Sequence, residues 1–223
     1  MRRIAALVLL GFLAACGSAP APAPIAPPNY SAPRLADPDT ICLRDLSAEN
    51  AIFQPLGSFG EGHCSIDNPV RITAGTVPWN HPGILTCQMA DTLVRFEATV
   101  VQPLARRLLG QPVRRMLNLG TYDCRTQRNE TTEAALRLGT SRGGKLSEHA
   151  KGRAIDFAGV ELADGSLITV KDNWRAGGAP QKFLHELARA SCDSFNVVLT
   201  PNHDRLHQDH IHMDIGPSVL CGY

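Results

Sequence analysis

Six cysteines between residues 42 and 221 constrain the fold of this chain more than any other feature of its sequence. Their spacing contains no C-x-x-C pair, which disfavours the alternative of a metal held by cysteines. An even number of cysteines in an exported chain predicts disulfides, here three, for which 15 pairings are possible. A bond between the last two would close the final segment at both its ends. The six residues are Cys42, Cys64, Cys87, Cys124, Cys192 and Cys221.

The first residues predict that the chain is exported. Two arginines precede an apolar run, Ile4 to Leu13, which is far shorter than the roughly 20 residues that a helix needs to cross a bilayer. This is typical of a signal peptide. The run ends in LAAC, which resembles the lipobox of bacterial lipoproteins, where the chain is cut before the cysteine and the cysteine is acylated. We therefore expect a signal peptide over residues 1–16, lipidation of Cys16, and a membrane-anchored lipoprotein in the periplasm. The alternative is an ordinary signal peptide cut near Ala15 to Ala19.

Two further segments complete the expected organisation. Residues 17–38 are rich in proline and alanine and have no apolar period, which predicts an extended linker of about 3.1 Å per residue. Residues 39–223 remain, enough for one domain with its own core. The net charge is +1, and the basic residues are scattered rather than gathered in a stripe, so nucleic acid is not an expected partner.

The apolar pattern predicts two main helices. One is expected over residues 84–110, where apolar residues recur near a period of 3.6. Pro103 should kink this helix or begin a second one, and Gly110 should end it. The other is expected over residues 179–195, with Pro180 in its first turn. The buried stripe of the first helix consists of Leu85, Met89, Phe96, Val100, Leu104 and Leu108.

Three segments have the character of strands. They begin at Val113, at residue 196 (NVVLTP) and at residue 209 (DHIHMDIG). Helices interspersed with short strands favour an α+β fold over a regular βαβ series. We expect a small antiparallel sheet with flanking helices, held together by the disulfides.

Imidazoles and carboxylates gather in two of the predicted strands and the loops before them. Side chains alternate along a strand, so His210 and His212 face the same side. The stretch RAIDFAGV at residues 153–160 is also expected to be a strand. If it pairs antiparallel with the strand of His210 and His212, Asp156 comes close to both histidines. His149 would reach in from the preceding loop, which Gly152 allows to turn tightly.

Such a group can hold a metal ion. Imidazole and carboxylate are good ligands for Zn²⁺, at about 2.0–2.2 Å. Three protein ligands leave a fourth position open for water, the usual arrangement in catalytic sites. The alternative is a set of hydrogen-bonded polar residues without a metal.

The stretch SEHAKGRAID at residues 147–156 resembles the S-x-H-x-x-G-x-A-x-D signature of the LAS zinc peptidases. These enzymes cut D-amino-acid links in bacterial cell walls and include D-alanyl-D-alanine carboxypeptidases and penicillin-insensitive murein endopeptidases. The stretch HQDHIH at residues 207–212 resembles the H-x-x-H-x-H pattern of the endopeptidase branch. The carboxypeptidase branch has a glutamate three residues before the last ligand, where this chain has Asp209.

Over almost the whole domain the chain is similar to the bacterial extensin-like C-terminal family. The similarity is carried by YDCR at residues 122–125 and by residues 147–165, 183–201 and 207–214. Together the two resemblances imply a zinc peptidase fold of the LAS type.

The LAS resemblance also implies roles for individual residues. The three zinc ligands correspond to His149, Asp156 and His212, and His210 corresponds to a histidine beside the metal that is not a ligand. Arg125 corresponds to an arginine that could stabilise the oxyanion near the scissile carbonyl. The alternative for Arg125 is a surface ion pair.

The remaining candidates concern proton transfer and substrate contact. We expect His210 to be the general base, with Asp209 as the second candidate and His207 orienting either group. His207, Ser147 and Tyr122 are candidate substrate-binding residues. Ser147 is expected mainly to cap the turn, and core packing explains Tyr122 and Trp174 equally well.

These features predict a zinc-dependent hydrolase of peptidoglycan peptide bonds, similar to a D,D-carboxypeptidase or an endopeptidase, with peptidoglycan as its partner. The alternative is a zinc-containing lipoprotein that binds the cell wall without catalysis. Hedgehog signalling domains resemble LAS enzymes and act by binding, so a retained metal site does not by itself establish turnover. A purely structural scaffold is harder to reconcile with so many potential ligands.

Overall fold

The computed structural model describes residues 38–127 and 144–222, which belong to one folded unit, Ala36–Tyr223. The predicted signal peptide, Cys16 and nearly all of the proline-rich linker lie outside the described residues, so these assignments stay predictions. Within the described ranges, no helix combines the length and the apolar character that a membrane span requires.

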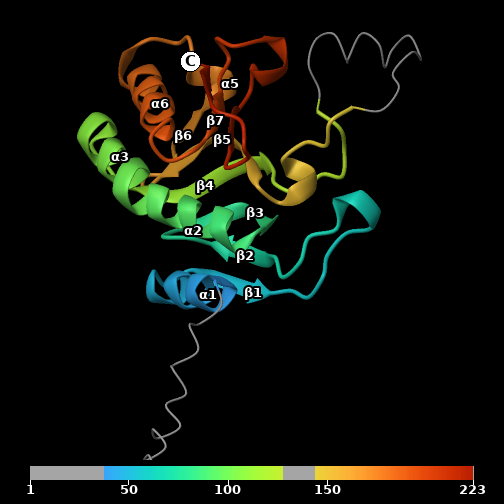
Figure 1. Cartoon of the computed structure of the whole chain (residues 1–223). Helices are drawn as coiled ribbons and strands as arrows, with labels where there is room; N and C mark the ends of the chain where they lie inside the picture. The colour runs from blue at the N-terminus through green and yellow to red at the C-terminus, as the bar shows by residue number, and fades with distance from the viewer. Residues whose placement is uncertain (1–37, 128–143, 223) are drawn as a thin grey trace, which may run out of the picture. The chain divides into compact units, whose positions relative to one another are not determined.

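A nine-stranded sheet forms the centre of the fold, in the order β1-β2-β3-β4-β5-β8-β7-β9, with β6 paired to β5 (Figure 1). The sheet is larger than the small sheet predicted. It is also mixed rather than antiparallel throughout, because β3 pairs with β4 and β7 pairs with β9 in parallel. The helical segment between β3 and β4 returns the chain to the same end of the sheet, which makes that pair parallel. The strands are β1 (Ile52–Pro55), β2 (Val70–Ala74), β3 (Pro78–Leu85), β4 (Val113–Gly120), β5 (Ala154–Leu162), β6 (Leu167–Thr169), β7 (Val197–Leu199), β8 (Ile211–Asp214) and β9 (Leu220–Gly222).

The helices flank this sheet, and α3 and α6 lie side by side (Figure 1). Short 3-10 turns, among them η3 and η4, connect some of the strands. The helical elements are α1 (Pro38–Ala48), η1 (Gly62–Cys64), α2 (Cys87–Phe96), η2 (Glu97–Val101), α3 (Gln102–Leu109), η3 (His149–Lys151), α5 (Val170–Asn173), α6 (Gly178–Ser191) and η4 (Arg205–His207). The architecture is therefore a mixed α+β fold.

The first predicted helix is confirmed in its main features, as a continuous run of α2, η2 and α3. It begins at Cys87 after Thr86, whose hydroxyl oxygen accepts a hydrogen bond from the backbone N–H of Met89, so Leu85 belongs to β3 and not to the helix. The segment η2 is a π-helical turn just before Pro103. Proline has no amide hydrogen and disturbs the hydrogen bonding of the turn before it, which explains the wider turn. The run ends at Gly110, whose φ of 75° is the left-handed geometry of a helix terminus.

The second predicted helix is α6, which ends four residues earlier than expected. Phe195 therefore lies beyond the helix, but it is buried and packs edge-to-face against Phe96 at a centroid distance of 5.3 Å. It contributes to the core as predicted, although from the turn that leads into β7.

All six cysteines of the domain are paired, which agrees with the expectation of three disulfides. Cys42–Cys87 joins α1 to the start of α2, and Cys64–Cys124 joins η1 to the segment after β4. Cys192–Cys221 joins the end of α6 to β9 and closes the last segment as the sequence suggested.

The two faces of β8 differ in character, and this difference positions the site. Ile211 and Met213 point into the core and are fully buried. The alternate residues, His212 and Asp214, lie on the other face of the strand. This second face is the floor of a cleft.

Candidate metal centre

Three side chains converge on one point at this face of the sheet. Antiparallel pairing of β5 with β8 places Asp156 directly opposite His212, as predicted. His149 comes from the turn η3, just before β5. The Nε2 atom of His149 lies 3.1 Å from Asp156 Oδ1 and 3.1 Å from His212 Nδ1, and these last two atoms are 3.2 Å apart. The three residues could hold a metal ion.

The size of this triangle fits a metal ion of the zinc class. Ligand atoms bound at about 2.0–2.1 Å in a tetrahedron are separated by about 3.3–3.4 Å. The observed edges of 3.1–3.2 Å are slightly shorter. The three atoms could therefore hold an ion of this class.

The outer nitrogens of both imidazoles are held by hydrogen-bond acceptors. His149 Nδ1 lies 2.6 Å from the backbone carbonyl oxygen of Thr121, so this nitrogen donates its hydrogen to that carbonyl. His212 Nε2 likewise donates to Asp214 Oδ2 at 3.0 Å. In the neutral imidazoles the inner nitrogens therefore carry lone pairs. With both imidazoles neutral, two lone pairs and a carboxylate oxygen face one another without a donor among them, and either a proton or a metal ion completes the arrangement.

The titration behaviour of the cluster indicates the same demand for positive charge. Burial by itself lowers the pKa of His212, but hydrogen bonds to Asp156 and Asp214 outweigh it and raise the pKa to about 9. Burial also opposes ionisation of Asp156, yet its bonds to His149 and His212 hold its pKa well below the usual range. A proton or a metal ion can supply the missing charge, and zinc-class ions compete with protons for such ligands.

The turn that carries His149 is fixed on several sides. The hydroxyl oxygen of Ser147 accepts from the backbone N–H of His149 at 3.3 Å, so Ser147 caps the turn as expected. The buried carboxylate of Glu148 accepts from Arg153 at 2.7–2.8 Å and from Lys151 at 3.0 Å. Gly152 has a φ of 62°, a left-handed conformation that glycine adopts without strain.

A fourth imidazole lies beside the cluster. His210 precedes β8 and its Nε2 is 3.4 Å from Asp156 Oδ1. Its Nδ1 donates to Asp209 Oδ1 at 2.8 Å, and the Asp209 side chain is itself half exposed. The sequence favoured His210 over Asp209 as the group beside the cluster, and the imidazole of His210 lies nearer Asp156 with the Asp209 carboxylate behind it.

A second pair of the same kind comes from the turn η4. His207 Nδ1 lies 2.7 Å from Asp204 Oδ1, which also accepts from the backbone N–H of Leu206 at 2.8 Å. Burial lowers the pKa of His207 despite the bond to Asp204, so its imidazole is predominantly neutral at neutral pH. The rings of His207 and His210 are 5.1 Å apart.

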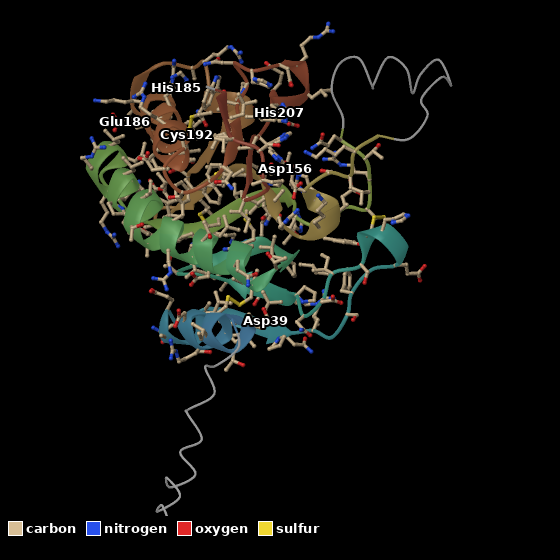
Figure 2. All side chains as sticks on the ribbon, viewed as in Figure 1. Asp39, Asp156, His185, Glu186, Cys192 and His207 are labelled. Atoms are coloured by element: carbon tan, nitrogen blue, oxygen red, sulfur yellow. A yellow bond between two sulfur atoms is a disulfide. The ribbon has the colours of Figure 1, made fainter. Side chains whose placement is uncertain are left out.

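Five of these residues, Asp156, Asp204, His207, His210 and His212, line one cleft of about 490 Å³. Figure 2 labels Asp156 and His207, which line this cleft, and also His185 on α6 and Cys192 just after it, which are not among its lining residues. Arg125 and Gln127 form part of the cleft wall on one side, and residues of β7 and β9 form part of it on another. The cleft therefore gives a ligand access to the His-Asp-His cluster.

The other predicted site residues have mixed positions. Arg125 lines the cleft, and its Nε donates to Asp123 Oδ2 at 2.8 Å. The ion pair is therefore present, and the oxyanion role stays a prediction. Tyr122 packs edge-to-face on Phe59 and donates to the backbone carbonyl of Cys64 at 3.0 Å; it is not among the described residues that line the cleft. Trp174 is buried in the core.

Sequence reasoning missed the groups that orient the ligands. Asp214 could have been found, because it lies two residues after His212 and so shares its strand face. The contribution of Thr121 is a backbone carbonyl, which leaves no signal in the residue type. The pairing of His207 with Asp204 could also have been predicted, because residues three apart lie on the same side of a helical turn.

Fold and site together define a disulfide-linked α+β domain with a buried His-Asp-His cluster that could hold a metal ion. The model of the family described as extensin-like protein C-terminus matches residues 40–222, and the chain belongs to this family. No curated protein matches the chain, and no solved structure does.

Proposed function

We propose that this domain is a zinc-dependent hydrolase that cuts peptide bonds of peptidoglycan and is related to the LAS peptidases. The observation that carries the proposal is the convergence of three lone-pair atoms, from His149, Asp156 and His212, at an open cleft. The similarity of SEHAKGRAID and HQDHIH to the LAS signatures supports the same reading.

The donor set favours zinc. Two imidazole nitrogens and one carboxylate oxygen, with one position left open, are the usual ligands of catalytic Zn²⁺. When bound, the ion would lower the pKa of a coordinated water and polarise a substrate carbonyl. The hydrogen bonds from His149 to Thr121 and from His212 to Asp214 fix both rings for this purpose.

The two Asp–His pairs would handle the protons. His210 presents Nε2 toward Asp156 and is held at Nδ1 by Asp209, so its Nε2 is placed to take a proton from the attacking water. Asp209 then acts through His210. His207, held by Asp204 and with its ring 5.1 Å from that of His210, would orient His210, and the proton that His210 takes from the water would pass to the departing amine. Arg125 in the cleft wall could stabilise the developing negative charge on the carbonyl oxygen.

Intact muropeptides provide the direct test. We expect the zinc-loaded full chain to release a new amine from them, and a chelator to stop this release. The His210→Ala variant should keep its zinc while turnover falls by at least about 100-fold. Asp209→Asn should retain more activity than His210→Ala. A dead Asp209→Ala variant beside an active His210→Ala variant, both with zinc, would reverse the assignment.

The same experiment addresses the alternative function. A domain that binds the cell wall without catalysis would hold the muropeptide and leave every bond intact, with zinc present. Binding without any cleavage across peptidoglycans of different cross-linking would therefore replace the hydrolase with the binding lipoprotein.

We also propose that the protein is a periplasmic lipoprotein anchored through Cys16. The three disulfides fit an oxidising compartment outside the cytoplasm, and LAAC at residues 13–16 resembles a lipobox. The Cys16→Ser variant should move from the membrane fraction to the soluble fraction of cells. Unchanged fractionation would count against the anchor.

A further inference from the structure

The strand register defines what lies beside the metal cluster on the floor of the cleft. Residues paired across neighbouring strands point to the same face of a sheet. His212 on β8 pairs with Leu199 on β7, and Asp214 pairs with Val197. One strand further, Val197 pairs with Leu220 on β9. One row of side chains therefore runs from His212 to Leu199. A second row runs from Asp214 through Val197 to Leu220.

The floor changes from polar to apolar along these rows. The side chains that β7 and β9 contribute to the cleft are Val197, Leu199 and Leu220, and Leu206 joins them from η4. The carboxylate of Asp214, next to Val197, is occupied by His212 and by the backbone N–H of Gly216 at 2.8 Å. A ligand side chain placed over Val197 and Leu220 therefore meets aliphatic groups, whereas the other row ends at Gly222, against which the His203 imidazole lies.

We propose that Val197, Leu199 and Leu220 form an apolar subsite for an uncharged aliphatic side chain of the substrate, on a residue next to the bond that is cut. This inference rests on the proposed function in taking a peptide as the occupant. Neighbouring strands are about 4.8 Å apart, and an extended peptide advances about 3.3 Å per residue. A peptide bond at the metal cluster thus places an adjacent side chain over β7.

The chemistry of this floor sets the preference. A charged or hydroxylated side chain would lose hydration there without gaining a partner from the three apolar residues. Each methylene that moves from water into such a site strengthens binding by about fourfold. The subsite therefore selects alanine-like or larger aliphatic side chains against serine and aspartate.

The strand β9, which carries Leu220, is held in place. The Cys192–Cys221 disulfide ties β9 to the end of α6. The backbone N–H and the hydroxyl of Thr200 both donate to the carbonyl oxygen of Gly222, at 3.2 and 3.0 Å. Val219, the residue before Leu220, is 85% exposed and is not among the described residues of the cleft wall. It provides a matched control.

The test measures binding of N-acetylated D-Xaa-D-Ala dipeptides to the zinc-loaded full chain, with Xaa as alanine, leucine, serine or aspartate. Titration calorimetry should give affinities at least about tenfold higher for leucine than for serine or aspartate. Leu220→Asp should weaken the leucine probe at least about tenfold, and Val219→Asp should change it less than twofold. Leu220→Ala, a milder change, should weaken it about fivefold and covers the case in which Leu220→Asp does not fold.

Equal affinities for the four probes, no binding of any of them, or equal effects of Leu220→Asp and Val219→Asp would overturn the subsite. The muropeptide assay on the same protein separates this failure from that of the hydrolase. Cleavage without any side-chain preference would remove the subsite alone. An aliphatic preference that depends on Leu220, without cleavage of any muropeptide, would remove the hydrolase alone.

Discussion

The domain contains two buried polar clusters that are built in opposite ways. In the Glu97 cluster, a carboxylate that is 1% exposed accepts from Trp79 Nε1 at 2.6 Å and from the backbone N–H and hydroxyl of Thr76 at 2.8 and 3.1 Å. Every contact joins a donor to an acceptor. The cluster ties the β2–β3 connection to the π-helical turn η2, and it is complete without a ligand.

In the His149 cluster, formed by His149, Asp156 and His212, the donors are turned outward. The outer N–H groups point to Thr121 and Asp214, and three acceptor atoms face one another inside. Burial of polar groups is common to both clusters and so does not identify a site. The direction of the donors distinguishes the two, because an inward set of acceptors can be completed by a proton or by a metal ion.

The largest expected effect is the loss of metal binding from the second cluster. We expect wild-type protein to bind about one Zn²⁺ per chain, and His149→Ala to lower the affinity by more than about 100-fold, because losing a ligand should exceed the loss of a group that only orients one. Elemental analysis and competition with a fluorescent chelator would measure this.

The matched control is His185→Ala, which removes a histidine on α6 whose ring packs on Trp174 outside the cleft. Its zinc content should equal that of the wild type. If wild-type protein takes up no zinc from solution, the His149 cluster is not a metal site, and the hydrolase proposal fails with it.

The next effect is a pH dependence of stability that arises from the Glu97 cluster. Burial raises the pKa of Glu97 from 4.5 to about 7, although bonds from Trp79 and Thr76 lower it. The folded chain therefore holds this proton more tightly than the unfolded chain. Its contribution to stability is full below pH 4.5 and is lost as the pH rises to about 7, by at most about 3 kcal/mol.

Urea unfolding of zinc-saturated protein at several pH values would measure this contribution. Glu97→Gln has no such group, so its free energy of unfolding should fall less than that of the wild type between pH 4.5 and 7.5. The amide places its own N–H₂ donor among donors, so the variant should also be less stable overall. Parallel pH profiles for the two proteins would show that Glu97 does not carry the effect.

The His149 cluster was more predictable from the sequence than most of the fold. Strand alternation and one antiparallel pairing were enough to bring Asp156 to His212, and the glycine in the preceding turn allowed His149 to reach them. These are local rules with a fixed period. The helices near Pro103 and Pro180 followed from equally local rules, because proline restricts the turn in which it lies.

The rest depended on partners distant in the sequence. The strand β2 alternates buried and exposed residues, but β1 is short and mostly exposed. The strand β3 contains Pro78 and Pro82, which argue against a strand when read alone. The parallel pairings follow from how the helices route the chain. Glu97 sits within a predicted helix, and nothing in its neighbours announces Trp79 and Thr76, which lie about twenty residues earlier. Local patterns therefore located the ligands but not the groups that hold them.

The smallest expected effect concerns Asp214, which supports the His149 cluster without joining it. Its two oxygens accept from His212 Nε2 at 3.0 Å and from the backbone N–H of Gly216 at 2.8 Å. In Asp214→Asn only one of these donors can keep an acceptor, and the negative charge that raises the basicity of His212 is gone. We expect zinc affinity to fall by about 10- to 100-fold with the fold intact.

The control is Glu97→Gln, which makes the same carboxylate-to-amide change in the Glu97 cluster. It should leave zinc affinity within about twofold, since Glu97 touches no ligand. Chelator competition on both variants, with circular dichroism to check folding, compares them directly. If both lose affinity equally, the loss reflects general destabilisation; if Asp214→Asn alone loses it, the outward hydrogen bond of His212 tunes the metal site.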